Sequence, residues 1–233
     1  MPTLLTSQSL ICLLVSFIFL KGCLAVSAHN NTSPYFERAL SHDRILAVLT
    51  RDDTVLSTTT SGDQKNARIY AFNGGGFLAV WEYNTSSDKS DIYVRRFDAN
   101  NNPITGEIKV NPSSPDLQND PRALILSNGH YVIVWNVKLN GVKEYEVSAQ
   151  VFDSNNNKVG PRIKVNTHST HSPTSPSIAA VYGGYVIIWE NWGQDGHYFG
   201  VYGQCFNLDH EPVNSEFHGS VNTYGEQNNA EIR

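Results

Sequence analysis

Short apolar runs recur along the chain at a nearly constant spacing. Three of them end in a tryptophan: GFLAVWE (76–82), HYVIVWN (130–136) and GYVIIWE (184–190). The three tryptophans, Trp81, Trp135 and Trp189, are therefore 54 residues apart. Apolar residues occupy both alternating faces of each run, which is typical of strands that are buried on both sides. We predict that the three runs form central strands, and that the tryptophans pack between sheets.

Three further elements accompany each tryptophan run. An opening element precedes it (67–72, 121–126 and 176–181), a run ending near Phe97, Phe152 or Phe206 follows it, and a fourth element comes last (107–111, 162–166 and 216–222). One unit thus holds four short strands in about 54 residues. Periods of this length with four strands predict an all-β, β-propeller-like fold built of four-stranded blades.

The units predict the domain organisation. They are a divergent partial blade (29–66), three full blades (67–120, 121–175 and 176–229) and the start of a next unit (230–233). Two arrangements fit this pattern. The last residues complete the first partial blade in a four-bladed ring, or the chain is a fragment of a larger propeller. Since unpaired strand edges invite pairing, self-association through the partial blades is a further expectation.

Polar positions within the units predict structural roles. The third element alternates, with Tyr93 and Phe97 on one face, so we predict a half-buried strand. Arg95, Gln150 and Gln204 recur on it, and we expect each to satisfy neighbouring backbone groups. Asn- and Asp-rich segments such as DANNNP (98–103) predict hairpin turns, because these residues tolerate left-handed backbone angles.

The N-terminus predicts secretion. The apolar run from Leu10 to Leu20 has 11 residues, which suits a signal peptide and is too short for a membrane span of about 20 residues. We place cleavage after Ala28, so that residues 1–28 form the signal peptide. Cys205 is then the one cysteine left, and its strand pattern predicts a buried free thiol.

Three sequons indicate a glycoprotein if the source is a eukaryote. They begin at Asn30, Asn31 and Asn84. Asn84 is the favoured site, because the polar stretch around it predicts a loop.

Composition narrows the function. The net charge of −5 lacks the basic excess of a nucleic-acid binder, and 40 % apolar residues are enough for a core. The G-x-S-x-G elbow of hydrolases is absent from the sequence. Glu82 and Glu190 follow tryptophans at matching positions, but Asn136 replaces them in the middle unit, which favours a structural role. We therefore expect no enzyme.

The segment GYVIIWENWGQDGHYFGVYGQCFNLDHEPVNSEF (184–217) carries a family resemblance. It resembles the tandem propeller-type repeats of large secreted and surface proteins of bacteria, calcium-dependent adhesins among them, and of ciliates. The resemblance extends over about residues 55–233. It implies extracellular display and binding rather than a reaction.

The candidate ligand-binding residues lie in one polar loop: Trp192, Asp195, His197 and Tyr198. A loop tryptophan beside such polar groups is typical of a carbohydrate site, and loops carry function more often than cores do. The alternative is an aromatic residue that caps a blade edge. His168 and His171 form HxxH, but without a helix or paired Glu they predict a solvated loop rather than a metal site.

Calcium is the one cofactor that the sequence suggests, because acidic residues recur in the predicted inter-strand loops: Asp63, Asp116, Asp120, Asp195 and Glu226. A complete EF-hand pattern is absent, so we favour hydrogen-bonded turn acids and predict no cofactor. The leading hypothesis is a secreted, non-enzymatic module that binds extracellular glycans or proteins through blade loops. The alternatives are a structural repeat segment of an adhesin-like surface protein and a degenerate glycosidase-type propeller.

Overall fold

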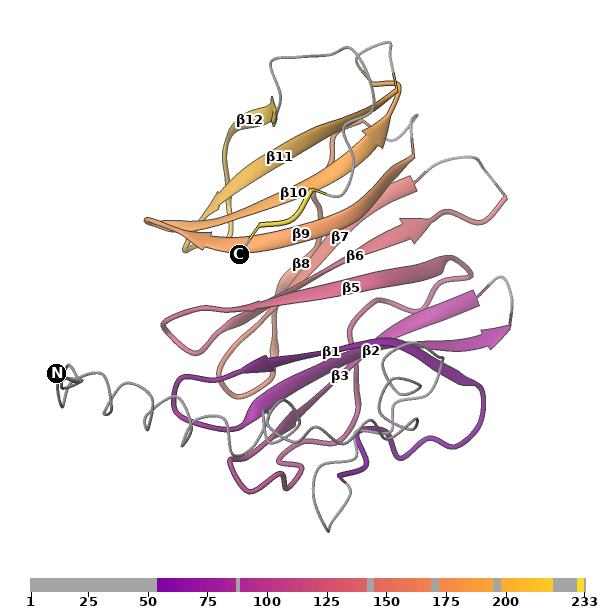
Figure 1. The fold of residues 1–233 in the computed structure, drawn as a ribbon, viewed down its shortest axis with the longest axis vertical. Coiled ribbons are helices and arrows are strands. Elements are labelled where there is room, and N and C mark those ends of the chain that lie inside the picture. Colours follow the sequence, from indigo (N-terminus) through magenta and orange to yellow (C-terminus); the bar gives the residue numbers. More distant parts are fainter. Residues whose placement is uncertain are drawn as a thin grey trace, which may run out of the picture.

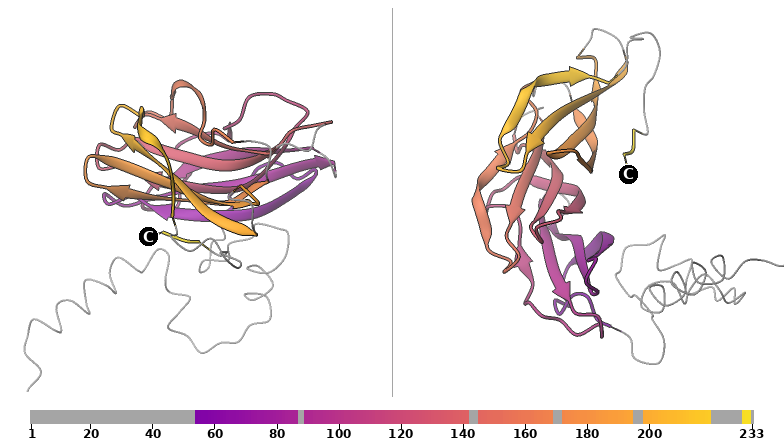
Figure 2. Two further views of the ribbon diagram at one scale, coloured as in Figure 1. Left: turned by 90° about the horizontal axis from the view of Figure 1, so that it is seen from above. Right: turned by 90° about the vertical axis from the view of Figure 1, so that its left-hand side faces the viewer.

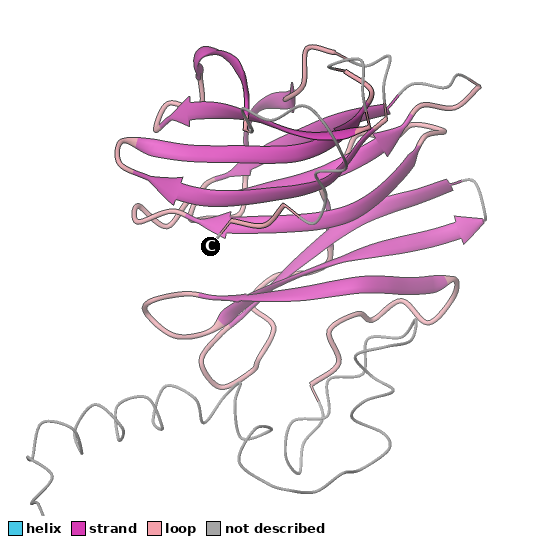
Figure 3. Ribbon diagram, turned by 45° about the horizontal axis from the view of Figure 1, so that its top comes forward, coloured by secondary structure: helices cyan, strands magenta, loops and turns pink. Residues whose placement is uncertain are grey.

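The structure is a computed structural model, which describes residues 54–86, 89–141, 145–168, 172–194, 198–219 and 230–232. Strands are the regular elements of these residues, and no described segment is helical (Figure 3). The prediction of an all-β chain is confirmed. The expected signal peptide and residues 29–53 of the partial blade lie outside the described residues. No helix in the described part of the chain is long and apolar enough to cross a membrane.

Twelve strands of the described chain form three consecutive units of four. The first blade consists of β1 (Asp63–Ala71), β2 (Phe77–Ser86), β3 (Lys89–Phe97) and β4 (Ile108–Lys109). The second blade consists of β5 (Leu117–Ile125), β6 (Tyr131–Lys138), β7 (Tyr145–Phe152) and β8 (Lys158–Lys164). The third blade consists of β9 (Pro173–Val181), β10 (Gly184–Trp192), β11 (Phe199–Asn207) and β12 (Pro212–His218).

Each blade is an antiparallel meander, in which strands that are consecutive in sequence pair with each other. The first two blades are joined by a single parallel bridge between Ser90 and Leu117. The opening strands β1, β5 and β9 lie next to one another, and the blades fan out from them as an arc (Figures 1 and 2). The described residues do not close into a ring, so the choice between ring and fragment stays a prediction.

The core lies between the blades. One apolar cluster joins Trp189 and Ile187 of the third blade to Val134 and Val147 of the second. A second cluster joins Trp135 to Leu78 and Val80 of the first blade in the same way. Trp81, Trp135 and Trp189 are 1 %, 0 % and 0 % exposed. The prediction that they pack between sheets is confirmed for Trp135 and Trp189, whereas Trp81 packs with Leu56 and residues of its own blade.

The half-buried prediction for the third strands is wrong for the first and second blades. In β3, Ile92 and Val94 are buried on one face, and Arg95 and Phe97 are buried on the other. All residues of β7 except Tyr145 are buried. The reason is that β7 is covered by a neighbouring blade on both faces. Gln150 is buried there because its amide donates to the carbonyl oxygens of Val151 and Gly160, at 3.1 and 3.2 Å.

Gln204 makes the equivalent bonds in the third blade, to Cys205 and Asn214 at 2.9 and 3.1 Å. Arg95 likewise donates to the carbonyl oxygens of Thr105 and Leu56, both at 3.2 Å. The predicted backbone-satisfying role of this position is therefore confirmed in all three blades.

The hairpin turns after the third strands also follow the prediction. Asp98 and Asp153 each accept two backbone N–H groups with one carboxylate oxygen, at 2.8 to 2.9 Å. The residue three places later is left-handed in each turn, at Asn101 (φ 66°), Asn156 (φ 70°) and His210 (φ 67°). The side-chain amides of Asn102 and Asn157 donate to the same carboxylates at 3.1 and 3.0 Å. These side-chain bonds, together with the backbone bonds, stabilise the charged form and lower the pKa of both aspartates below its ordinary value.

In the fourth element, a glycine of the third blade replaces a valine of the other two. The backbone N–H groups of Val110 and Val165 bond to the third strand of their blades at 2.8 Å, and Gly219 makes the equivalent bond to Val201 at 2.7 Å. Gly219 therefore occupies the position of Val110 and Val165.

Candidate functional site

The candidate site lies at the far end of the β10–β11 hairpin. Trp192 ends β10 and Phe199 begins β11, and their Cα atoms are register partners. Gly193 follows with a left-handed φ of 72°, and its N–H donates to the carbonyl oxygen of Tyr198 at 2.8 Å. The strand pairing and this bond together fix the backbone positions from which the aromatic side chains of Trp192, Tyr198 and Phe199 extend.

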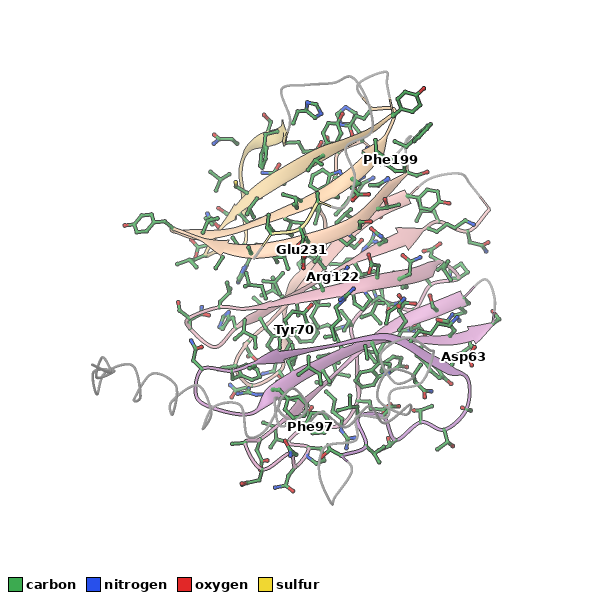
Figure 4. The ribbon with its side chains drawn as sticks, viewed as in Figure 1. Asp63, Tyr70, Phe97, Arg122, Phe199 and Glu231 are labelled. Atoms are coloured by element: carbon green, nitrogen blue, oxygen red, sulfur yellow. The ribbon has the colours of Figure 1, made fainter. Side chains whose placement is uncertain are left out.

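Three aromatic rings meet there and form what we call the aromatic corner: Trp192, Tyr198 and Phe199. The ring of Trp192 lies 5.7 Å from that of Tyr198 at an interplanar angle of 80°, and 5.1 Å from that of Phe199 at 77°. Trp192 and Tyr198 are 45 % and 53 % exposed, while Phe199 is half-buried. Figure 4 shows Phe199 at the outer end of the third blade, away from Arg122 and Glu231 nearer the middle.

The other blades show that the fold does not require this corner. The positions of Trp192 and Phe199 are held by Asn84 and Ser90 in the first blade, which are register partners. In the second blade they are held by Lys138 and Tyr145. Because two blades form the same hairpin with polar residues at the tryptophan position, exposing a tryptophan here serves no need of the blade.

Two side-chain amides adjoin the corner. The Asn191 amide donates to Oε1 of Gln194, a half-buried side chain two residues after Trp192. Asn191 is 0 % exposed, and its Oδ1 has no hydrogen-bond partner among the described residues. The Nε1 of the buried Trp189 is also without such a partner there. This end of the blade therefore carries unused buried hydrogen-bonding groups, which are uncommon in folded proteins.

The predicted site residues are only partly placed. Trp192 and Tyr198 contact each other, whereas Asp195 and His197 lie outside the described residues. Phe199 was not predicted. The sequence repeat could have indicated it. Residues 192 and 199 align with Lys138 and Tyr145, and this pair, like Trp192 and Phe199, is a pair of register partners.

The predicted glycosylation sites are also only partly described by the structure. Asn30 and Asn31 lie outside the described residues. Asn84 lies within strand β2 rather than in a loop, which corrects the prediction about its surroundings. It pairs with Asp63 and Ser90 in register, and its Oδ1 is buried. The polar composition of the segment misled the interpretation, because the strand runs on past the core.

Glu82 and Glu190 are held in contacts between blades. Oε1 of Glu82 accepts the Asn66 amide at 2.7 Å and the backbone N–H of Asp120, in the second blade, at 2.6 Å. Oε1 of Glu190 accepts the N–H of Ala230 at 3.1 Å, in the C-terminal segment that lies beside β9 (Figure 1). In both cases the carboxylate after the tryptophan accepts a backbone N–H group from the chain segment that follows its own blade. This agrees with the structural role predicted from the sequence.

The middle blade breaks this pattern. Asn136 is 6 % exposed, and its Oδ1 has no partner within the described part of the chain. The matching donor position in the next blade is Ser175, which has a left-handed φ of 52°, like Asp120 at 53°. The asparagine side chain is one methylene shorter than glutamate and makes no such bond to Ser175.

The acids weighed for calcium do not gather. Asp63 and Asp120 lie in strands β1 and β5, not in loops. Asp120 contacts Arg122 at 2.5 Å and Arg68 at 3.8 Å, and Asp116 accepts the N–H of Asn140 at 2.9 Å. Among the described residues no three His, Cys, Asp or Glu side chains are grouped to hold a metal ion. Asp195 and Glu226 lie outside those residues.

Two histidines meet between the second and third blades. The rings of His130 and His210 stack at 6.1 Å with an interplanar angle of 24°, and Nδ1 of His210 lies 3.4 Å from the hydroxyl of Tyr185. Burial lowers the pKa of His210 below its ordinary value of 6.5, and His130 lowers it further, while Asp209 opposes both. His168 of the HxxH pair instead faces Glu216 at 3.4 Å, and His171 lies outside the described residues.

Comparison with known proteins gives distant structural similarities. No protein-family model matches the chain, and no curated protein matches it. The chain is similar to a thermostable family-43 glycoside hydrolase, with a TM-score of 0.48 and 11 % identity over 69 % of this chain and 55 % of that one. It thus spans about half the length of that protein, at 55 %.

Two further similarities are to enzymes named for arabinan. An endo-arabinase from Bacteroides thetaiotaomicron gives a TM-score of 0.48 and 13 % identity, covering 71 % of this chain and 68 % of that one. A GH43 endo-arabinanase from Bacillus licheniformis gives 0.34 and 8 %, covering 65 % and 77 %.

Proposed function

We propose that the chain is a secreted, non-enzymatic binding module that recognises extracellular glycans through the aromatic corner. The observation that carries this proposal is the exposed Trp192, which is held by a regular hairpin at a position where the other two blades have Asn84 and Lys138. Large aromatic side chains with one apolar face and a wet surrounding are favoured at recognition surfaces. Sugar rings present C–H faces that stack on such rings.

Binding is tested by screening the secreted chain on a glycan array. The test variant is Trp192→Asn, which introduces the residue of the first blade, and the matched control is Tyr182→Asn. Tyr182 is fully exposed at the β9–β10 turn, outside the corner. We expect selective binding that weakens by about tenfold or more in Trp192→Asn, because truncating a central aromatic contact costs about 2 kcal/mol or more. Unchanged binding in that variant, with loss in the control, would contradict the proposal.

Secretion is tested separately by expressing the whole chain and reading the N-terminus of the protein in the medium. Cleavage after Ala28 gives a mature protein that begins at His29. Retention of the full chain inside the cell would contradict this part of the proposal. The apolar run and the small residues before the cleavage position support it.

A structural repeat segment of a surface protein is the second candidate function. Its support is the repeated bond between blades, from Glu82 to Asp120 and from Glu190 to Ala230. A spacer of this kind binds no glycan, so a folded sample that is silent on the array favours it. Hydrolysis of an aryl glycoside that is lost on removing one carboxylate would instead establish the glycosidase alternative.

A further inference from the structure

The relative orientation of the rings in the aromatic corner limits what can bind there. Trp192 stands at 80° to Tyr198 and at 77° to Phe199. A flat ligand surface can lie against one ring plane, but it meets a perpendicular ring only at an edge. Two exposed rings at nearly a right angle therefore fit the face and the rim of one small ring better than an extended plane.

The corner is also fixed before a ligand arrives. Trp192 and Phe199 are opposite each other in a paired sheet, and Tyr198 is joined to Gly193 by a backbone bond of 2.8 Å. These backbone contacts reduce the freedom that the corner can lose on binding, and this loss is a main cost of association. The perpendicular arrangement would persist in the bound state.

We infer that the corner takes a single sugar ring, at the end or on a branch of a soluble glycan, and does not bind the flat face of crystalline polysaccharide. The C–H face of the sugar lies on one exposed ring and its rim meets the other. This inference rests on the proposed function and names the ligand class of the same site.

The experiment compares soluble oligosaccharides with insoluble crystalline cellulose and chitin, using the secreted chain. Binding to the soluble ligands is measured by calorimetry, and binding to the solids by depletion from the supernatant. The variants are Trp192→Asn and Tyr198→Asn. Tyr182→Asn is the matched control, because Tyr182 is a fully exposed aromatic residue outside the corner. Thermal unfolding of each variant confirms that its fold is intact.

The expected result is binding to soluble oligosaccharides that weakens tenfold or more in both Trp192→Asn and Tyr198→Asn, persists in Tyr182→Asn, and has no counterpart on the solids. Binding to the solids that is lost in Trp192→Asn but kept in Tyr198→Asn would overturn the inference and leave the proposed function standing. Absence of binding to both kinds of ligand by the folded parent chain would overturn the proposed function together with the inference.

Discussion

The bond that Glu82 makes between two blades predicts a measurable share of the stability. The side chain is 4 % exposed, and Oε1 accepts both the Asn66 amide at 2.7 Å and the Asp120 N–H at 2.6 Å. Hydrogen bonds to a charged group contribute about 1.5–3 kcal/mol each. Glu82→Ala removes both and leaves the Asp120 N–H unpaired, so we expect a loss of about 3–5 kcal/mol. Glu82→Gln keeps an acceptor and should cost about half of that.

The assay is urea unfolding at neutral pH, with thermal unfolding as a second measurement. For a chain of this size, about 2–4 °C of Tm is lost per kcal/mol, so Glu82→Ala should melt roughly 6–20 °C lower. Glu211→Ala is the control, because that glutamate is exposed in a turn and should change stability by about 0.5 kcal/mol or less. Hydrogen exchange gives a local readout, since the Asp120 amide should lose protection. A Glu82→Ala protein as stable as the control, with that amide still protected, would refute the reasoning.

Three further predictions use the same unfolding assay. An added Cβ on Gly184 would lie 1.9 Å from the carbonyl oxygen of Phe206, so Gly184→Ala should cost about 2–4 kcal/mol. Gly106→Ala, which meets nothing within 4 Å, should be close to neutral, and equal effects would refute the prediction. Asn136→Glu restores the carboxylate of the other blades and should stabilise by about 1 kcal/mol, within the net range of one hydrogen bond; any loss of stability counts against it. The folded state lowers the pKa of His210 below 6.5. The contribution of neutral His210 to the free energy of unfolding is therefore complete above pH 6.5 and is lost as the pH falls below that value. His210→Asn, the residue of both other turns, should flatten the decline in stability below pH 6.5, and an unchanged slope would contradict this.

The blade architecture could be predicted because its signals are local and repeated. The tryptophan strands are buried on both faces and form apolar runs, and a spacing of 54 residues between tryptophans leaves few other interpretations. The starts of the opening strands were missed for a physical reason. Residues 118–120 and 174–175 are polar, yet they lie in β5 and β9, which extend past a bulge that faces the tryptophan.

The bulges themselves have no common residue type. Asn66, Asp120 and Ser175 hold the same left-handed position, with φ between 49° and 53°. Their backbone is constrained by contacts outside their own strand, such as the bond from the Asp120 N–H to Glu82. Such contacts are not visible in a local pattern. The candidate site shows the same difference between local and non-local signals. Trp192 and Tyr198 could be singled out because they lie in one polar stretch, whereas the place of Phe199 depends on the register of the hairpin.

The three blades act as controls for one another, and this separates the demands of the fold from those of function. Where the blades agree, as at Trp81, Trp135 and Trp189, burial accounts for the residue. Where one blade departs and the new residue is half-buried against a neighbour, as at His210, packing between blades accounts for it. Trp192 departs in the opposite direction, because it exposes a large apolar ring where the same hairpin elsewhere carries polar side chains. An exposed aromatic cluster adds nothing to the blade and raises the risk of association. A ligand that covers these rings explains why they are exposed, which the fold alone does not explain.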